Sequence, residues 1–221
     1  NIIGSMLSNI LTIIIGLIAQ AVFIKILGSE YLGLNGLFSN IITMLGIVEF
    51  GVGNAIIYNL YKPIAENNIS KIKSLMNFYK KSYRLIACIV AIIGIIIIPF
   101  LPFFIEEISI DINITLVYLL FLIDVVCSYL LSYKRSILYA NQKNYIINIV
   151  HIIYTILLNT SQLLVLFFTK NYYYYLIMKI IMRILENFII SKIADKKYAF
   201  INEPSEKLDK ETEKDIFTKV K

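Results

Sequence analysis

Hydrophobic residues fall into six long runs along this chain, and the charged residues gather mostly between them. The runs cover residues 6–27, 37–60, 84–105, 112–133, 145–169 and 172–193. Each run has about the 20 residues that an α-helix needs to cross a bilayer. Because lipid cannot satisfy bare backbone groups, each run is expected to be helical. The pattern predicts an all-α polytopic membrane protein. Residues 1–194 form a six-helix transmembrane lobe, and an amphipathic connector covers 195–221.

Composition favours the same class. Hydrophobic residues make up 58% of the 221 positions, charged residues 16%, and the mean hydropathy is +0.75. Cys88 and Cys127 both lie inside apolar runs, where cysteine behaves as a small hydrophobe, so neither a disulfide framework nor a metal site is expected. No cofactor is predicted. The chain begins at Asn1 and ends at Lys221 in a charged segment, so we expect it to belong to a longer protein.

Lysine and arginine alternate between the two sides of the predicted lobe. The second and fourth connecting segments and the tail are basic, whereas the first, third and fifth carry one such residue or none. Positive residues favour the cytoplasmic side. Both ends of the chain and the even-numbered segments are therefore predicted to be cytoplasmic.

Polar residues form continuous faces on the last two predicted helices. Spacings of three or four residues place them on one side of each helix. On the fifth run these are Asn144, Asn148, His151, Thr155, Asn159 and Gln162, and on the sixth Tyr172, Tyr175, Lys179, Arg183 and Glu186. Neutral polar residues in membrane helices often only bond one helix to another. His151 fits such a bond better than a metal site, because no second ligand stands at a suitable spacing.

Charged residues near the middle of a bilayer are costly and usually mark function. Arg183 has Glu186 three residues on as a local partner, and that pairing would leave Lys179 free. These bases suit an anionic cargo such as a phosphate or pyrophosphate. Glu49, which stands among glycines in the second run, and Asp124 in the fourth suit a coupling cation or proton, or pairing with the bases. We therefore predict a hydrated cavity. Its substrate-binding candidates are Lys179, Arg183, His151, Asn148, Asn159 and Gln162, and its ion-coupling candidates are Glu49 and Asp124.

One family shows a similar order of segments. Residues 27–63 read LGSEYLGLNGLFSNIITMLGIVEFGVGNAIIYNLYKP, and a basic segment with KIKSLMNFYKKSYR follows. After an outward-going first run, these segments resemble the polysaccharide flippases of the multidrug/oligosaccharidyl-lipid/polysaccharide exporter superfamily. The tail LDKETEKDIFTKVK is similar to the connector that precedes the seventh span in those proteins. The resemblance covers essentially the whole chain and is strongest in 27–63.

The resemblance implies a fold of two six-helix lobes around a central cavity in a bacterial or archaeal cytoplasmic membrane. This chain would be the N-terminal lobe, so its partners would be a missing C-terminal lobe or a second copy, and membrane lipids. The implied cargo is an oligosaccharide unit on undecaprenyl pyrophosphate, for O-antigen, capsule or exopolysaccharide. Alternating access coupled to protons or sodium would move it outward. Glu49 matches the acid of the family's second-span motif, whereas Lys179 and Arg183 match its cavity bases only as a type.

Three alternatives remain open at this point. A cation-coupled drug antiporter of the same superfamily would use Glu49 and Asp124, but bases in the cavity oppose a cationic cargo. A membrane-embedded polysaccharide-processing enzyme would need a nucleophile–base pair, a phosphate-binding glycine loop or metal-ligand spacing, and the sequence offers none. A structural membrane module would pack its polar faces together without hydrated volume. No feature predicts a nucleic-acid partner.

Overall fold

The chain folds into a bundle of helices, seen here in a computed structural model. The structure describes residues 2–49, 52–105, 111–209, 212–213 and 216. Within these ranges the protein is all-helical, with eight α-helices, three short 3-10 helices and no strand. The elements are α1 (Ile2–Leu27), α2 (Ser29–Leu45), η1 (Gly46–Glu49), α3 (Val52–Ala65), α4 (Ile69–Ile97), η2 (Ile98–Phe104), α5 (Ile114–Leu130), α6 (Tyr133–Ala140), α7 (Asn144–Thr169), α8 (Tyr172–Lys197) and η3 (Ala199–Asn202).

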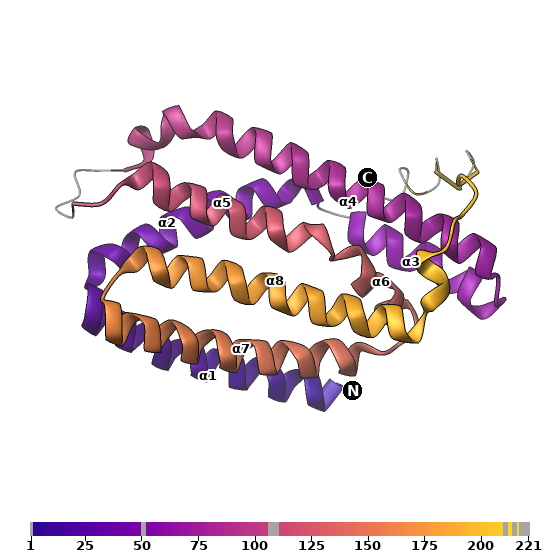
Figure 1. Ribbon diagram of the computed structural model, residues 1–221, viewed down its shortest axis with the longest axis horizontal. Coiled ribbons are helices and arrows are strands. Elements are labelled where there is room, and N and C mark those ends of the chain that lie inside the picture. Colours follow the sequence, from indigo (N-terminus) through magenta and orange to yellow (C-terminus); the bar gives the residue numbers. More distant parts are fainter. Residues whose placement is uncertain (1, 50–51, 106–110, 210–211, 214–215, 217–221) are drawn as a thin grey trace.

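The long helices lie side by side along one axis and alternate in direction (Figure 1). Asparagine side chains cap the first turns of three of them: Asn68 accepts a hydrogen bond from the Lys71 amide, Asn113 from Leu116, and Asn171 from Tyr173. Such caps satisfy backbone donors that have no partner inside the helix. Between α1 and α2 the chain reverses at Gly28, whose φ of 103° favours glycine. The polar residues between apolar runs therefore fix where each helix begins.

Close contacts with α4 hold the neighbouring helices in place. Tyr79 and Tyr118 are fully buried. The Tyr79 hydroxyl donates to the Ile56 carbonyl of α3 over 3.0 Å, and the Tyr118 hydroxyl of α5 donates to the Gly94 carbonyl over 2.9 Å. At Gly94 an added Cβ would come within 2.3 Å of a Leu122 methyl group. Gly94 thus allows α4 and α5 to approach closely, as small residues do between membrane helices.

The second predicted run, 37–60, is not one helix. Helix α2 ends at Leu45, the 3-10 turn η1 follows, and α3 begins at Val52. The predicted ion-coupling residue Glu49 lies in η1, at the break. The fourth predicted run, 112–133, ends at a second break, where α5 and α6 meet at a bend of 46°. Both breaks place irregular backbone in the middle of the molecule, and membrane proteins tolerate this only where the backbone is buried in protein or lines a cavity.

Two of the described helices are long and apolar enough to cross a membrane by themselves, at Ile69–Phe104 and Asn144–Thr169. A third crossing results if the bent pair α5–α6 counts as one span. The described part of α1 gives a shorter apolar helix, Thr12–Leu27. Helix α8 carries Lys179, Arg183 and Glu186 along its length, which lowers its hydropathy. These helices indicate a membrane protein, whereas the predicted six-span bundle is not confirmed.

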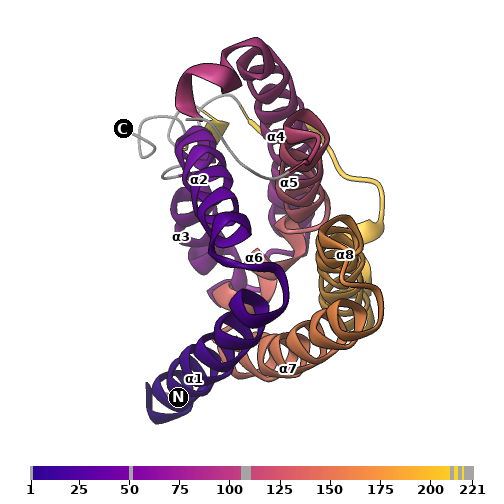
Figure 2. The same ribbon diagram turned by 90° about the vertical axis from the view of Figure 1, so that its left-hand side faces the viewer.

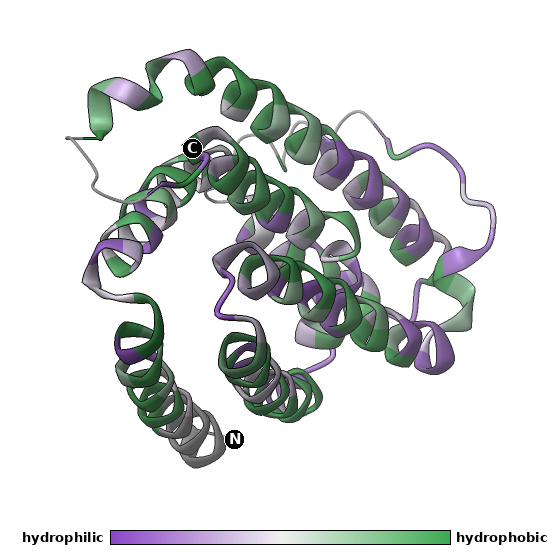
Figure 3. Cartoon of the chain, turned by 60° about the vertical axis from the view of Figure 1, so that its left-hand side comes forward, coloured by the Kyte–Doolittle hydropathy of each residue, from purple (hydrophilic) through white to green (hydrophobic). Residues whose placement is uncertain are grey.

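Large apolar side chains cover much of the outside of the bundle. Leu17 is 62% exposed, Phe103 85% and Phe168 78%. Figure 3 shows hydrophobic residues along the long helices, whereas the segment that follows α8 is largely hydrophilic. Soluble monomers rarely expose apolar surface on this scale. The outside is therefore suited to lipid.

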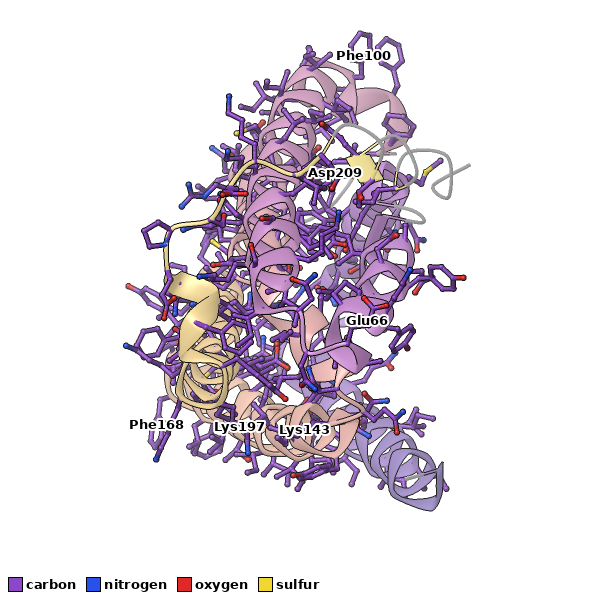
Figure 4. All side chains as sticks on the ribbon, turned by 90° about the vertical axis from the view of Figure 1, so that its right-hand side faces the viewer. Glu66, Phe100, Lys143, Phe168, Lys197 and Asp209 are labelled. Atoms are coloured by element: carbon purple, nitrogen blue, oxygen red, sulfur yellow. The ribbon has the colours of Figure 1, made fainter. Side chains whose placement is uncertain are left out.

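Residues 207–221 of the connector are predicted to form a surface helix with Leu208, Ile216 and Val220 on one side, but 207–209 are not helical. Val220 lies outside the described residues. After η3 the chain runs back along α4 in extended form (Figures 1 and 4). Leu208 packs against the core and Ile216 is only 2% exposed. Leu208 and Ile216 therefore contact the bundle itself.

Ion pairs and hydrogen bonds hold the connector on the first turns of α4. Lys73 lies 3.2 Å from Glu203, and Asn77 donates to the Ser205 hydroxyl over 3.1 Å. Lys71 pairs with Asp209 and also donates to Thr212. The hydrogen bond from Lys71 is the main cause that lowers the pKa of Asp209 from its ordinary value. Lys71 and Lys73, whose positive charge predicts the cytoplasmic side, therefore also hold the connector against α4.

Candidate functional site

Charged side chains from α5, α6, α7 and α8 lie within contact distance of one another inside the bundle. Figure 2 shows how these four helices are arranged. We call this group of side chains the charged cluster. It consists of Asp124, Arg135, His151, Lys179, Arg183 and Glu186. Such a cluster is costly inside a membrane unless its members neutralise one another or reach water.

Glu186 is the centre of the charged cluster. Its side chain is fully buried, with 0% exposure. Oε1 lies 3.0 Å from His151 Nδ1, and Oε2 lies 3.2 Å from Arg135 Nη2 and 3.5 Å from Arg183 Nη1. The two arginine contacts are ion pairs without hydrogen-bond alignment. One carboxylate thus joins α6, α7 and α8, which are far apart in sequence.

Asp124 forms the second centre. Oδ2 lies 3.2 Å from Lys179 Nζ, and Oδ1 lies 3.5 Å from Arg183 Nε. Lys179 also lies over the Phe121 ring, with 4.8 Å from Nζ to the ring centroid. The prediction that Lys179 would be left free is therefore wrong: its partner comes from another helix, which spacing along α8 does not reveal.

A cavity of about 320 Å³ lies next to the charged cluster. It is located where the interruption after α2 and the bend between α5 and α6 come together. We call it the arginine cavity. Glu49 of η1, Arg135 of α6 and Arg183 of α8 contribute the charges on its wall. The other lining residues are Gly53, Asn54, Ile57, Tyr83, Ser128, Tyr129, Ser132, Ser136, Tyr139 and Asn187. This wall carries two cations, one acid and many neutral hydrogen-bonding groups.

The polar groups around the arginine cavity are held in fixed positions. Asn187 accepts a hydrogen bond from Arg135 over 2.8 Å and donates to the carbonyls of Cys127 and Ser128, both over 3.2 Å. The carboxylate of Glu49 interacts with the hydroxyls of Tyr83 and Tyr129. Arg135 is 23% exposed and Arg183 27%. Each guanidinium group therefore lies against a buried carboxylate and is partly exposed at the cavity.

The arrangement suits the binding of an anion. Arginine presents a planar fork of donors that matches phosphate oxygens, and partial burial strengthens each contact. Hydroxyls of serine and tyrosine provide further donors beside the two arginines. A cation would be repelled by the two arginines, and Glu49 is the one acidic residue among the described residues that line this cavity.

The predicted site residues lie at several places in the bundle. Arg183 and Glu49 line the arginine cavity, while His151, Lys179 and Asp124 belong to the charged cluster behind it. Asn159 and Gln162 lie further along α7. Gln162 is buried and donates to the Tyr175 carbonyl over 3.1 Å, and Asn159 lines a different cavity. Asn148 is half-buried on the same helix. The predicted set is thus not brought together at one site.

Sequence reasoning missed three contributors. Arg135 stands near the end of the fourth run, and a position near a span end suggests a side chain that reaches the cytoplasmic surface. The bend between α5 and α6 turns it inward instead. Tyr83 and Tyr129 were also missed, because tyrosines are common throughout this chain. A weak signal did exist: Arg135 continues the polar face of Asp124, Ser128 and Ser132.

Comparison with known proteins gives no matching family model, no matching characterised protein and no matching solved structure. The function must therefore be argued from the site itself.

Proposed function

We propose that this chain is one lobe of a flippase for undecaprenyl-pyrophosphate-linked oligosaccharides in a bacterial or archaeal cytoplasmic membrane. The observation that carries the proposal is the pair Arg135 and Arg183, which stand together on the wall of one cavity in an apolar bundle. A pyrophosphate offers several anionic oxygens to such a pair. The lipid tail would stay in the bilayer beside the apolar outer surface.

In this proposal the chain crosses the membrane six times, through α1, α2–α3, α4, α5–α6, α7 and α8. The alternating helix directions support it, as does the position of both chain breaks beside the arginine cavity. Discontinuous helices in transporters commonly form substrate sites near the middle of the bilayer. Both ends of the chain would be cytoplasmic. A second lobe, from a longer parent protein or a second copy, would close the path on the other side.

Transport would follow from alternating access of the two lobes. With the cavity open to the cytoplasm, Arg135 and Arg183 bind the pyrophosphate, and a rocking motion then turns the cavity outward. Glu49 is the remaining candidate for a coupling proton or cation, because it faces the cavity beside two tyrosine hydroxyls. Asp124 is a weaker candidate for ion coupling than the sequence indicates, because Lys179 and Arg183 already neutralise its carboxylate.

The same contacts weigh against the alternatives. A drug antiporter for cations would bring positive cargo against two arginines, with like-charge repulsion in a partly buried site. An enzyme would need a nucleophile beside a base. The histidine of the cluster instead faces Glu186, and the nearby serines donate to carbonyls of their own helices. We therefore favour a transporter over an enzyme.

Export of surface polysaccharide tests the proposal in cells. Arg135→Ala combined with Arg183→Ala, introduced into the chromosomal gene so that the parent protein stays whole, is expected to lower surface polysaccharide by at least about tenfold, because both cavity bases are lost. The matched control is Arg84→Ala, which removes an exposed base of α4. Protein levels are compared by immunoblotting. Normal export by the double variant at normal levels would exclude these bases from the mechanism.

A further inference from the structure

A second cavity, of about 410 Å³, lies between α1, α2, α7 and α8. We call it the neutral cavity, because none of the described residues that line it is charged. Its wall contains amides and hydroxyls from Gln20, Asn35, Ser39 and Asn159, with the aromatic rings of Phe23 and Tyr175. Gly16, Ala19, Leu32 and Gly36 complete it. This wall differs sharply from that of the arginine cavity.

Two glycines lie on the wall of the neutral cavity. A Cβ added at Gly16 or Gly36 would meet nothing within 4 Å, whereas a Cβ added at Gly94 would collide with Leu122. Gly94 thus serves close packing, but Gly16 and Gly36 border empty volume. The cavity is open to the outside of the bundle, since Gln20 and Gly36 on its wall are exposed. Polar groups on its wall favour a polar occupant.

The aromatic side of the cavity is held rigidly. The Phe23 and Tyr175 ring centroids lie 5.0 Å apart, and those of Phe23 and Tyr172 5.9 Å apart. The Tyr172 hydroxyl donates to Asn35 Oδ1 over 3.3 Å, and Gln162 donates to the Tyr175 carbonyl. By contrast, the side-chain polar atoms of Gln20 and Ser39 make no hydrogen bond to any residue that the structure describes. The cavity therefore combines a fixed aromatic wall with donors and acceptors still available to a ligand.

We infer that the neutral cavity binds a neutral, hydroxyl-rich ring, that is, an uncharged sugar. Amides and hydroxyls pair with sugar hydroxyls as both donors and acceptors. Aromatic side chains offer a flat apolar face and a polar tip, which suits the C–H faces of a sugar ring. A phosphate would find no cation among the described residues of this wall, and an acyl chain would offer no hydrogen-bond partner to Gln20 and Ser39.

Helix α8 links this cavity to the other one. Tyr175, Lys179, Arg183 and Asn187 follow at four-residue intervals and share a face. Tyr175 lines the neutral cavity, while Arg183 and Asn187 line the arginine cavity. Eight residues of helix separate Tyr175 from Arg183, about 12 Å. One cargo with pyrophosphate at one end and sugar at the other would reach both cavities. Only this assignment of both cavities to a single cargo rests on the proposed function.

Binding of two separate probes to the chain in lipid nanodiscs tests the inference, since detergents with sugar headgroups would compete. The probes are the neutral disaccharide N,N′-diacetylchitobiose, followed by saturation-transfer NMR, and inorganic pyrophosphate, followed by calorimetry. Gly36→Leu fills the cavity and is expected to weaken disaccharide binding at least about tenfold, with pyrophosphate binding unchanged. Gly33→Leu is the matched control: Gly33 is also exposed on α2 with nothing within 4 Å, but does not line the cavity.

A second variant, Asn159→Ala, removes an amide from the opposite wall and is expected to weaken disaccharide binding in the same direction. The inference would be overturned if the parent chain did not bind the disaccharide, even if it bound pyrophosphate. It would also be overturned if Gly36→Leu and Asn159→Ala left disaccharide binding unchanged. Disaccharide binding that both variants weaken, in a chain that does not bind pyrophosphate, would support the neutral cavity and contradict the proposed function.

Discussion

Replacing Glu186 by alanine is expected to lower the free energy of unfolding by about 3–5 kcal/mol, the usual cost of removing one partner of a buried ion pair. The Glu186 carboxylate is fully buried, and it neutralises Arg135 and Arg183 while accepting the contact of His151. Without it, Arg183 keeps only Asp124, which Lys179 also contacts, and Arg135 loses its acidic partner in this cluster. Denaturant unfolding in mixed micelles, followed by circular dichroism, measures the change.

The control for this prediction is Glu66→Ala. Glu66 also faces a lysine, Lys62, but at 3.9 Å and with both side chains more than half exposed. An exposed pair of this kind contributes less than about 1 kcal/mol. Glu186→Gln keeps the shape of the side chain and should fall between the two. If Glu186→Ala were no less stable than Glu66→Ala, the carboxylate would not be the counter-charge of the cluster.

Replacing Arg135 and Arg183 together by alanine is expected to weaken pyrophosphate binding by at least about 100-fold. Each hydrogen bond between charged groups contributes about 1.5–3 kcal/mol, and 1.4 kcal/mol corresponds to a factor of ten in affinity. Both residues line the arginine cavity, and both have a buried carboxylate behind them. Titration calorimetry of the chain in nanodiscs gives the dissociation constants.

Two single variants make this result specific. Lys179→Ala should weaken binding less than Arg183→Ala, because Lys179 is paired with Asp124 and does not line the arginine cavity. Arg84→Ala removes the same type of charge from the exposed surface of α4 and should change the dissociation constant less than twofold. An equal loss in all variants would mean that pyrophosphate responds only to net charge.

The sequence predicted the helices well where polar residues end an apolar run. The fifth run was predicted at 145–169 and helix α7 spans Asn144–Thr169. The sixth, 172–193, begins with α8 at Tyr172, where Asn171 caps the helix. In both cases the short polar segment between runs supplies the signal, because it contains the capping and turn residues.

The break inside the second run and the bend at the end of the fourth run could not be predicted in this way. Hydropathy stays high through 46–49 and 131–132, so the hydrophobic pattern continues although the α-helix ends. The end of α2 before Gly46 and the bend before Tyr133 depend on how α4 and α8 pack against these segments. Such tertiary contacts cannot be read from the hydrophobic pattern. The same breaks bring Glu49 and Arg135 to one cavity.

The candidate site was predicted only in part, for a related reason. Helical spacing identified Arg183, His151 and Glu186 on faces that do meet, since periodicity shows which residues share a side of one helix. It cannot show which helix lies opposite. The Lys179–Asp124 pair and the partnership of Arg135 with Glu186 both join different helices, so they were not foreseen.

Thiol labelling of Ser132→Cys tests the central claim most directly: that the middle of the bundle holds a hydrated, anion-binding cavity. The variant is made in a background with Cys88→Ser and Cys127→Ser, and Ser74→Cys, at a buried position outside the cavity lining, is the control. We expect a membrane-impermeant, anionic thiol reagent to label Ser132→Cys but not Ser74→Cys, and pyrophosphate to slow the labelling. A Ser132→Cys thiol that reacts only after denaturation, or at a rate indifferent to pyrophosphate, would contradict the account.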